Sequence, residues 1–162
     1  IRRSKVYRTM DDVKKNYFTS GQMRNALMQI EDKMVHSGWM PNIILGINRG
    51  GCIPGVYLSH RLKVPHEALD VRLRDHTAKP NLQTLEKAFA YQKKILIIDD
   101  INDSGATFKY ILENFGKHEQ RIKFAALIHN KPSEVKVDYH GYEINKDEVP
   151  AWIVFPWEDW DK

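Results

Sequence analysis

The sequence contains a single cysteine, Cys52, among its 162 residues. A disulfide framework or a cysteine-based zinc site needs several cysteines, so both are excluded within this chain. Apolar runs long enough to cross a bilayer, about 18 residues, do not occur. Residues 1–5 also lack the apolar stretch of a secretory signal. We therefore expect a cytoplasmic protein that has no membrane partner.

Clusters of positive charge are equally scarce. The chain has 25 Lys and Arg against 21 Asp and Glu, and its longest purely basic runs are only pairs, among them Arg2–Arg3 and Lys93–Lys94. A net charge of +4 fits a small anionic substrate, but the absence of a basic stripe disfavours nucleic-acid binding as the main function. No two of the seven histidines have the spacing of a helical zinc site.

The composition that remains is that of a folded domain. It is 42% hydrophobic and 28% charged, with nine glycines and seven prolines spread along the chain. A chain of this length buries about two-thirds of the surface that it exposes when unfolded. With no internal repeat and no linker, residues 1–162 are predicted to form one domain.

Apolar runs and helical periodicities alternate along the chain. Ser20 is a plausible N-cap and Gly38 a plausible stop for the first helix, and Gly116 suits the end of a later one. For residues 74–91 the sequence allows two predictions, a short amphipathic helix or a long functional loop, and does not decide between them. Helices are predicted at 20–37, from about 53, and at 107–115, and strands at 42–47, 69–73, 95–98, 124–128, 142–144 and 152–155.

This alternation predicts an α/β fold, with a mostly parallel sheet covered by helices on both faces. In such folds ligands bind where the carboxyl ends of strands meet the N-termini of helices. Residues 95–107 provide such a place: four aliphatic residues, then acids, small residues and hydroxyls before a predicted helix. The successive backbone N–H groups at a helix N-terminus favour a phosphate, and Gly105 permits close approach. The acids fit a sugar phosphate, whose hydroxyls they would bind, or a Mg²⁺ ion.

This string resembles the signature of type I phosphoribosyltransferases, enzymes that bind 5-phosphoribosyl 1-pyrophosphate. The resemblance implies a roughly five-stranded parallel sheet and a small C-terminal hood, here placed mainly at 130–162. It also implies that Asp99 and Asp100 hold the ribose hydroxyls, and that Asp100 helps to bind Mg²⁺. The 5′-phosphate would lie on Asp103, Ser104, Gly105, Ala106 and Thr107, and Asp103 would act as the catalytic acid–base group.

Residues 46–55 carry a second likeness, to the pyrophosphate loop of the xanthine-guanine branch of that family. Arg49 and Gly50 are accordingly expected to bind pyrophosphate, because a guanidinium is a rigid fork of donors for a diphosphate. A non-proline cis peptide is frequent at this loop in the family. A second pyrophosphate contact could come from Arg72, Arg74 or Lys79, among which the sequence does not choose.

The C-terminal part carries a third likeness, to purine phosphoribosyltransferases. Lys131 would contact the 6-oxygen of the base, Trp152 would stack on its ring, and Ile153 would complete the base site. Glu158 is a further candidate ligand for Mg²⁺, and packing of the hood is an alternative role for Trp152, Trp157 and Trp160. The chain departs from the xanthine-guanine branch by having Ile-Asn-Asp-Ser-Gly-Ala-Thr where that branch usually has Leu-Val-Asp-Thr-Gly-Gly-Thr.

Together these likenesses imply a Mg²⁺-dependent enzyme that joins guanine, hypoxanthine or xanthine to the ribose of phosphoribosyl pyrophosphate. Its products would be a nucleoside 5′-monophosphate and pyrophosphate, and its role purine salvage. Analogy with the family suggests a homodimer or homotetramer. Two alternatives are a nucleotide-sensing RNA-binding regulator of the same fold and a phosphoribosyltransferase for another base.

Overall fold

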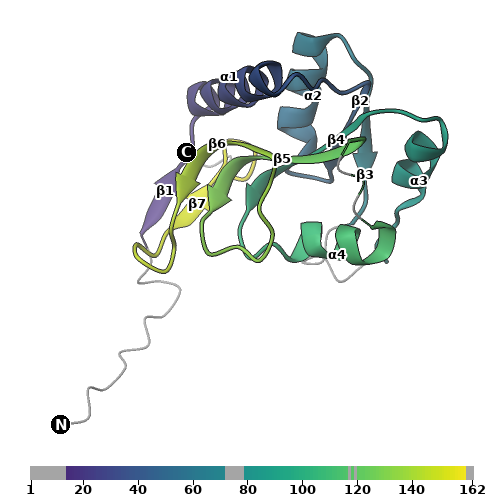
Figure 1. Ribbon diagram of the computed structural model, residues 1–162. Helices are drawn as coiled ribbons and strands as arrows, with labels where there is room; N and C mark the ends of the chain where they lie inside the picture. Colours follow the sequence, from purple (N-terminus) through teal and green to yellow (C-terminus); the bar gives the residue numbers. More distant parts are fainter. Residues whose placement is uncertain (1–13, 72–78, 117, 119, 160–162) are drawn as a thin grey trace.

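The computed structural model describes residues 14–71, 79–116, 118 and 120–159 (Figure 1). These residues contain four helices and seven strands, which alternate as far as β5 and are followed by β6 and β7. The helices are α1 (Ser20–Ser37), α2 (Cys52–Leu62), α3 (Gln83–Ala90) and α4 (Ala106–Phe115). The strands are β1 (Lys15–Tyr17), β2 (Ile43–Ile47), β3 (His66–Leu69), β4 (Ile95–Asn102), β5 (Ile122–Asn130), β6 (Tyr139–Ile144) and β7 (Trp152–Val154).

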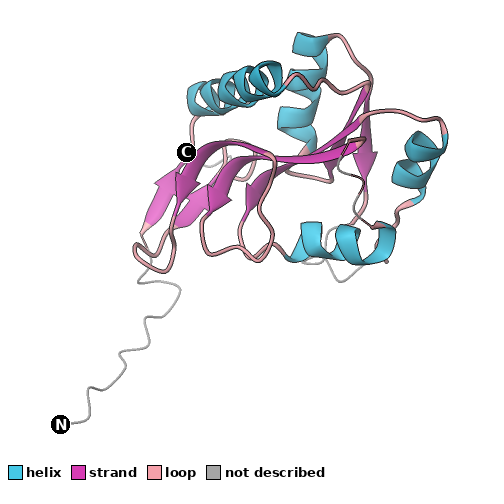
Figure 2. Cartoon of the chain, viewed as in Figure 1, coloured by secondary structure: helices cyan, strands magenta, loops and turns pink. Residues whose placement is uncertain are grey.

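The main sheet has five strands in the order β3-β2-β4-β5-β6, and every neighbouring pair is parallel. This confirms the predicted five-stranded parallel sheet. Helices lie on both of its faces (Figure 2). Strands β2 and β4 contain unbroken aliphatic runs because a parallel sheet covered on both sides buries successive side chains in opposite directions.

Two hydrophobic clusters form the core, one on each face of the sheet. On one face, α1 and α2 pack on strand residues that include Ile44, Leu96 and Leu127. On the other face, α3 and α4 pack on the alternate residues, among them Leu45 and Ile97. The period-two alternation of the strands therefore decides which helix each side chain meets.

Helix α1 has the predicted bounds, 20–37, but its N-cap lies one residue earlier than predicted. Thr19, not Ser20, is the N-cap: its side chain accepts from the backbone of Gln22, whose side chain accepts in return from the Thr19 backbone. This reciprocal capping box satisfies two donors, whereas a cap by Ser20 alone would satisfy one. Gly38 closes the helix in the left-handed conformation, at a φ of 71°.

Other boundaries differ where local signals were weak. Strand β3 occupies His66–Leu69 rather than 69–73, because its residues pair with Ile44 to Ile47 of β2. For residues 74–91, the alternatives were a short amphipathic helix and a long loop. In the described part of this stretch the structure has the helix, α3, which buries Leu85 and Ala88. Strand β4 continues through the acids to Asn102, so Asp99 and Asp100 belong to the sheet itself.

A second, two-stranded sheet pairs β1 with β7 in parallel. Strand β1 was not predicted, because three polar and aromatic residues carry no periodicity. Strand β6, which falls within the expected hood at 130–162, is an edge strand of the main sheet. The piece separate from that sheet is therefore built from both ends of the described chain. Within the described residues, no helix has the length and apolarity that a membrane span requires.

Candidate active site

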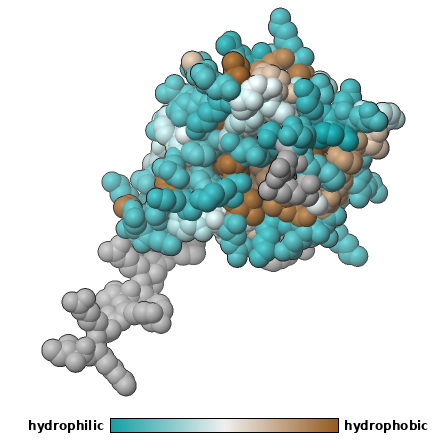
Figure 3. Space-filling model, viewed as in Figure 1, coloured by the Kyte–Doolittle hydropathy of each residue, from teal (hydrophilic) through white to brown (hydrophobic). Residues whose placement is uncertain are grey.

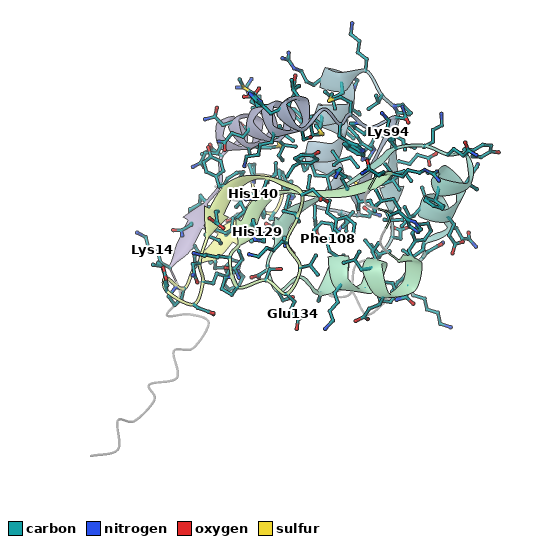
Figure 4. All side chains as sticks on the ribbon, viewed as in Figure 1. Lys14, Lys94, Phe108, His129, Glu134 and His140 are labelled. Atoms are coloured by element: carbon teal, nitrogen blue, oxygen red, sulfur yellow. The ribbon has the colours of Figure 1, made fainter. Side chains whose placement is uncertain are left out.

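The carboxyl ends of the parallel strands bring the polar motifs to one edge of the sheet. A pocket of about 70 Å³ at the end of β4 is lined by ten consecutive residues, Asp99 to Phe108. This is the run that the sequence singles out. Phe108 of α4, labelled in Figure 4, lines this pocket and has 1% of its surface exposed. Its ring centre lies 4.5 Å from that of Phe124 in β5.

The turn between β4 and α4 has the geometry of an anion cradle. Gly105, the N-cap of α4, has a φ of 88° and presents no side chain at the helix N-terminus. The Ser104 hydroxyl lies 3.2 Å from the Ala106 backbone N–H, and Thr107 is half-buried in the first turn. The first N–H groups of a helix have no carbonyl partner within it, and its dipole favours negative charge there. The turn is thus suited to a phosphate.

Gly105 is required for a reason that sequence reasoning missed. A Cβ at this position would lie 2.6 Å from Ser133 Oγ and 2.8 Å from the Val135 backbone nitrogen. The close approach is therefore to the chain itself, to the segment at 131–138 beneath the cradle. The backbone of Glu134 also donates to the Ser104 carbonyl, at 3.0 Å.

Asn102, with 1% of its surface exposed, holds that segment in place. Its side-chain amide donates to the Val135 carbonyl at 2.6 Å and to His129 Nδ1 at 3.1 Å, and its oxygen accepts from Ser133 at 3.2 Å. Every polar atom of the buried amide is thereby paired, as burial demands. The polar residue that follows the acids is thus a structural support of the cradle.

Asp99 and Asp100 both accept local backbone bonds. The Asp99 carboxylate accepts from the Asp100 N–H at 2.8 Å, and the Asp100 carboxylate accepts from the Ile101 N–H at 2.8 Å. Asp100 is the more buried, with 6% of its surface exposed. Among the residues that the structure describes, no group of three or more His, Cys, Asp or Glu side chains could hold a metal ion.

The loop after β2 reaches the same edge. A Cβ on Gly51 would lie 2.9 Å from the Asp99 Cα and closer still to the Ile98 carbonyl, so this loop packs directly on the end of β4. The Asn48–Arg49 peptide bond is cis, as the family likeness predicts, and the Arg49 side chain is exposed. Asn48 fastens the loop by donating to Asp70 at 2.8 Å. The structure thus brings the predicted phosphate and pyrophosphate loops together.

The predicted base-site residues are more widely spread. Trp152 is 40% exposed, with the Lys15 amino group 5.6 Å from its ring centre. Lys131 follows β5 with an exposed side chain, while Ile153 packs on the core face. Trp157 stacks on Phe155 and serves the core, whereas Trp160 lies outside the described residues.

The other candidates are less informative. The Glu158 carboxylate accepts from the Phe155 N–H at 3.0 Å, within its own C-terminal turn. Its assignment to Mg²⁺ stays a prediction. Lys79 is exposed, and Arg72 and Arg74 lie outside the described residues. Cys52 donates to the Gly46 carbonyl at 3.3 Å, in keeping with the packing role that small size suggests.

Asp103 has two side-chain partners that the sequence did not indicate together. Lys146, in the connection between β6 and β7, places its amino group 2.8 Å from Asp103 Oδ2. Asn130 at the end of β5 donates to the Asp103 carbonyl at 3.2 Å and to its Oδ1 at 3.3 Å. Asn130 could have been found, because it ends a parallel strand at the ligand-binding edge. Lys146 lies in an irregular connection that has no such signal.

Burial lowers the pKa values of three histidines of the main sheet. Burial lowers the pKa of His129 and of His140, which stack at 5.2 Å on β5 and β6 (Figure 4). For His129 the neighbouring His140 lowers the pKa further, and for His140 the neighbouring Lys33 does. The pKa of His66 on β3 is also lowered, again by burial.

Comparison with known proteins places this geometry in a family. A family model described as a phosphoribosyl transferase domain matches residues 14–159. A purine phosphoribosyltransferase from Pyrococcus horikoshii is 31% identical and superimposes with a TM-score of 0.68, over 91% of this chain and 96% of that chain.

Two more distant structures share the fold. A xanthine-guanine-hypoxanthine phosphoribosyltransferase from Helicobacter pylori is 17% identical, with a TM-score of 0.67 over 90% of this chain and 93% of its own. An orotate phosphoribosyltransferase from Aeropyrum pernix is 11% identical, with a TM-score of 0.50 over 77% and 71%. Purine and pyrimidine enzymes alike therefore resemble this chain in fold.

Proposed function

Since the chain belongs to the phosphoribosyl transferase domain family, we propose that it transfers the 5-phosphoribosyl group of phosphoribosyl pyrophosphate to a 6-oxopurine. The observation that carries this proposal is the pocket lined by Asp99 to Phe108, with the glycine-capped N-terminus of α4 as its phosphate cradle. The products are a nucleoside 5′-monophosphate and pyrophosphate, and the role is purine salvage.

The donor substrate is bound by charge and by backbone. The 5′-phosphate accepts hydrogen bonds from the backbone N–H groups of residues 104–107 and from the Ser104 and Thr107 hydroxyls. The carboxylates of Asp99 and Asp100 accept from the ribose hydroxyls. The exposed Arg49 guanidinium, on the loop that packs on β4, binds the pyrophosphate and stabilises its charge as it leaves.

The donor set also fits Mg²⁺. Mg²⁺ is usually held by one or two protein carboxylates together with substrate oxygens, and Asp100, with Asp99 beside it, supplies such a set next to the cradle. When bound, Mg²⁺ would neutralise charge on the pyrophosphate. The protein's own contribution is to fix these carboxylates through their backbone hydrogen bonds.

Base selection is assigned to Trp152, Lys131 and Ile153. The exposed face of Trp152 can stack on a base of any substituent pattern. A lysine ammonium only donates, so Lys131 suits a 6-oxo group and mismatches the amino group of adenine. Asp103, at the start of the cradle, accepts the proton of the purine imidazole nitrogen as the bond to ribose forms.

A panel of bases tests this proposal. The purified protein is incubated with phosphoribosyl pyrophosphate, Mg²⁺ and either guanine, hypoxanthine, xanthine, adenine or orotate, and base consumption is measured. We expect turnover of at least one 6-oxopurine. In Lys131→Gln, we expect the preference for 6-oxopurines over adenine to be smaller than in the unmodified protein. Robust turnover of adenine or orotate alone would overturn the base assignment. Turnover of none would overturn the proposed function.

A further inference from the structure

The carboxylate of Asp103 is held at both oxygens by residues from two other segments. Lys146 lies 2.8 Å from Oδ2, and Asn130 lies 3.3 Å from Oδ1. A carboxylate contacted at one oxygen can still rotate about its last bond, whereas contacts at both oxygens fix its plane. The group to which the proposed function assigns proton transfer is thus constrained at both of its oxygens.

Asn130, which contacts Asp103, is itself buried and fixed by a hydrogen bond. Asn130 is 6% exposed, and its side-chain oxygen accepts from the Lys146 backbone N–H at 3.0 Å. Its amide nitrogen reaches both the backbone carbonyl and the side chain of Asp103. One buried amide therefore ties together the end of β5, the β6–β7 connection and the start of the cradle.

The Lys146–Asp103 ion pair lies in a partly buried environment. Their side chains are 26% and 25% exposed, so water only partly screens the pair. Solvent-exposed ion pairs contribute little to stability, which gives the exposed Lys109–Glu134 pair little importance. Three further hydrogen bonds join Asn130 to Asp103 and Lys146, and these fix the geometry of the pair.

We propose that Lys146 is a positioning residue for Asp103, with Asn130 as its anchor. This inference rests on the proposed function, because it concerns the group that receives the purine proton. The ammonium, 2.8 Å from Oδ2, keeps the carboxylate plane directed at the base. Lys146 thus acts on the rate of transfer through Asp103, without contacting the base.

A double-mutant cycle separates this role from others. Lys146→Met, Asp103→Asn and the double variant are compared with the unmodified enzyme, using the base that is turned over best. We expect Lys146→Met to lower kcat about tenfold to a hundredfold, the range for losing a hydrogen bond to a charged group, at an unchanged KM for the base. In the Asp103→Asn background the same change should have no further effect, and Lys146→Arg should restore most of the rate.

Two controls show that the fold and site remain intact. Lys93→Met removes an exposed lysine just before β4, at the opposite end of the sheet from the cradle, and should leave kcat unchanged. Binding of the nucleoside 5′-monophosphate product to Lys146→Met, measured by calorimetry, should match that of the unmodified enzyme.

The outcomes distinguish the inference from the function on which it rests. If Asp103→Asn is slow but Lys146→Met is not, only the positioning role is overturned. If Lys146→Met raises KM for the base and weakens product binding, Lys146 binds the base, and the positioning role is again overturned. If Asp103→Asn turns over at the normal rate, the acid–base assignment fails and the role of Lys146 fails with it.

Discussion

At the scale of single residues, Gly105 meets two demands at once. Its φ of 88° lies in the left-handed region that glycine tolerates best, and its missing Cβ leaves room for Ser133 and Val135. The first demand shapes the turn around an anion. The second lets the segment at 131–138 support that turn from below.

We expect Gly105→Ala to weaken binding of a nucleoside 5′-monophosphate at least tenfold and also to lower stability. The added Cβ would lie 2.8 Å from the Val135 backbone nitrogen, so the cradle or its support must shift. Calorimetric titration measures the first effect and urea unfolding the second. Unchanged phosphate affinity would show that the anion binds elsewhere.

The residues of the cradle and those that support it differ in how far apart they lie along the chain. The acids at 99, 100 and 103 and the glycine turn are neighbours in sequence, and their pattern predicts the cradle on its own. The support of that cradle comes from residues near 130, 133 and 146, which only the parallel sheet brings close. A single sequence contains no signal for such distant polar contacts, so they could not be predicted.

At the scale of elements, the central strands follow from composition alone. The aliphatic runs of β2 and β4 are buried on both faces of the sheet, which suits strands in its interior. Edge elements are different: β3 shows mixed burial along His66–Leu69, and β1 has three exposed residues. Their positions are set by pairing with β2 and β7, not by their own residues, and for that reason β3 was misplaced and β1 was missed.

Helix α1 sits so close to β6 that only glycine fits between them. A Cβ on Gly141 would lie 2.7 Å from the Ala26 Cα and 2.8 Å from the Leu127 carbonyl. We expect Gly141→Ala to lower the free energy of unfolding by about 1–3 kcal/mol, the cost of overpacking a core. Urea unfolding followed by circular dichroism measures it.

Gly21→Ala is the matched control for that substitution. Gly21 lies in α1, and a Cβ added there would have Thr19 Oγ1 as its nearest neighbour, at 3.8 Å. Alanine should therefore stabilise the helix there, by up to about 1 kcal/mol. Equal effects at the two positions would refute a steric role for Gly141.

At the scale of the whole molecule, the visible surface is largely hydrophilic, with hydrophobic areas between the polar ones (Figure 3). The net charge of +4 is spread over the chain without a basic run longer than two residues. Such a surface supplies a weak general attraction for phosphorylated substrates, while their specific recognition is left to the cradle and to Arg49.

Three partly buried histidines, each with a lowered pKa, connect global stability to pH. The His66 ring packs against Gly46 and Gly55, and within the described chain its buried Nε2 has no hydrogen-bond partner. His129 is buried and His140 is partly buried, and burial is the main cause of all three pKa shifts. Protonation is therefore easier in the unfolded chain, where the pKa is near 6.5, than in the folded one.

The contribution of these histidines to the free energy of unfolding is therefore fully present above pH 6.5. It falls as the pH is lowered towards the folded-state pKa values, because the unfolded chain then binds more protons than the folded one. We expect the urea midpoint to decline between about pH 7 and pH 5, a window above the ordinary titration of carboxylates. His66→Leu should make that decline shallower, since it removes one of the three groups. His60→Leu, at an exposed position in α2, should leave the slope as it is. A midpoint that rises on acidification would mean that the histidines gain partners on folding, contrary to their burial here.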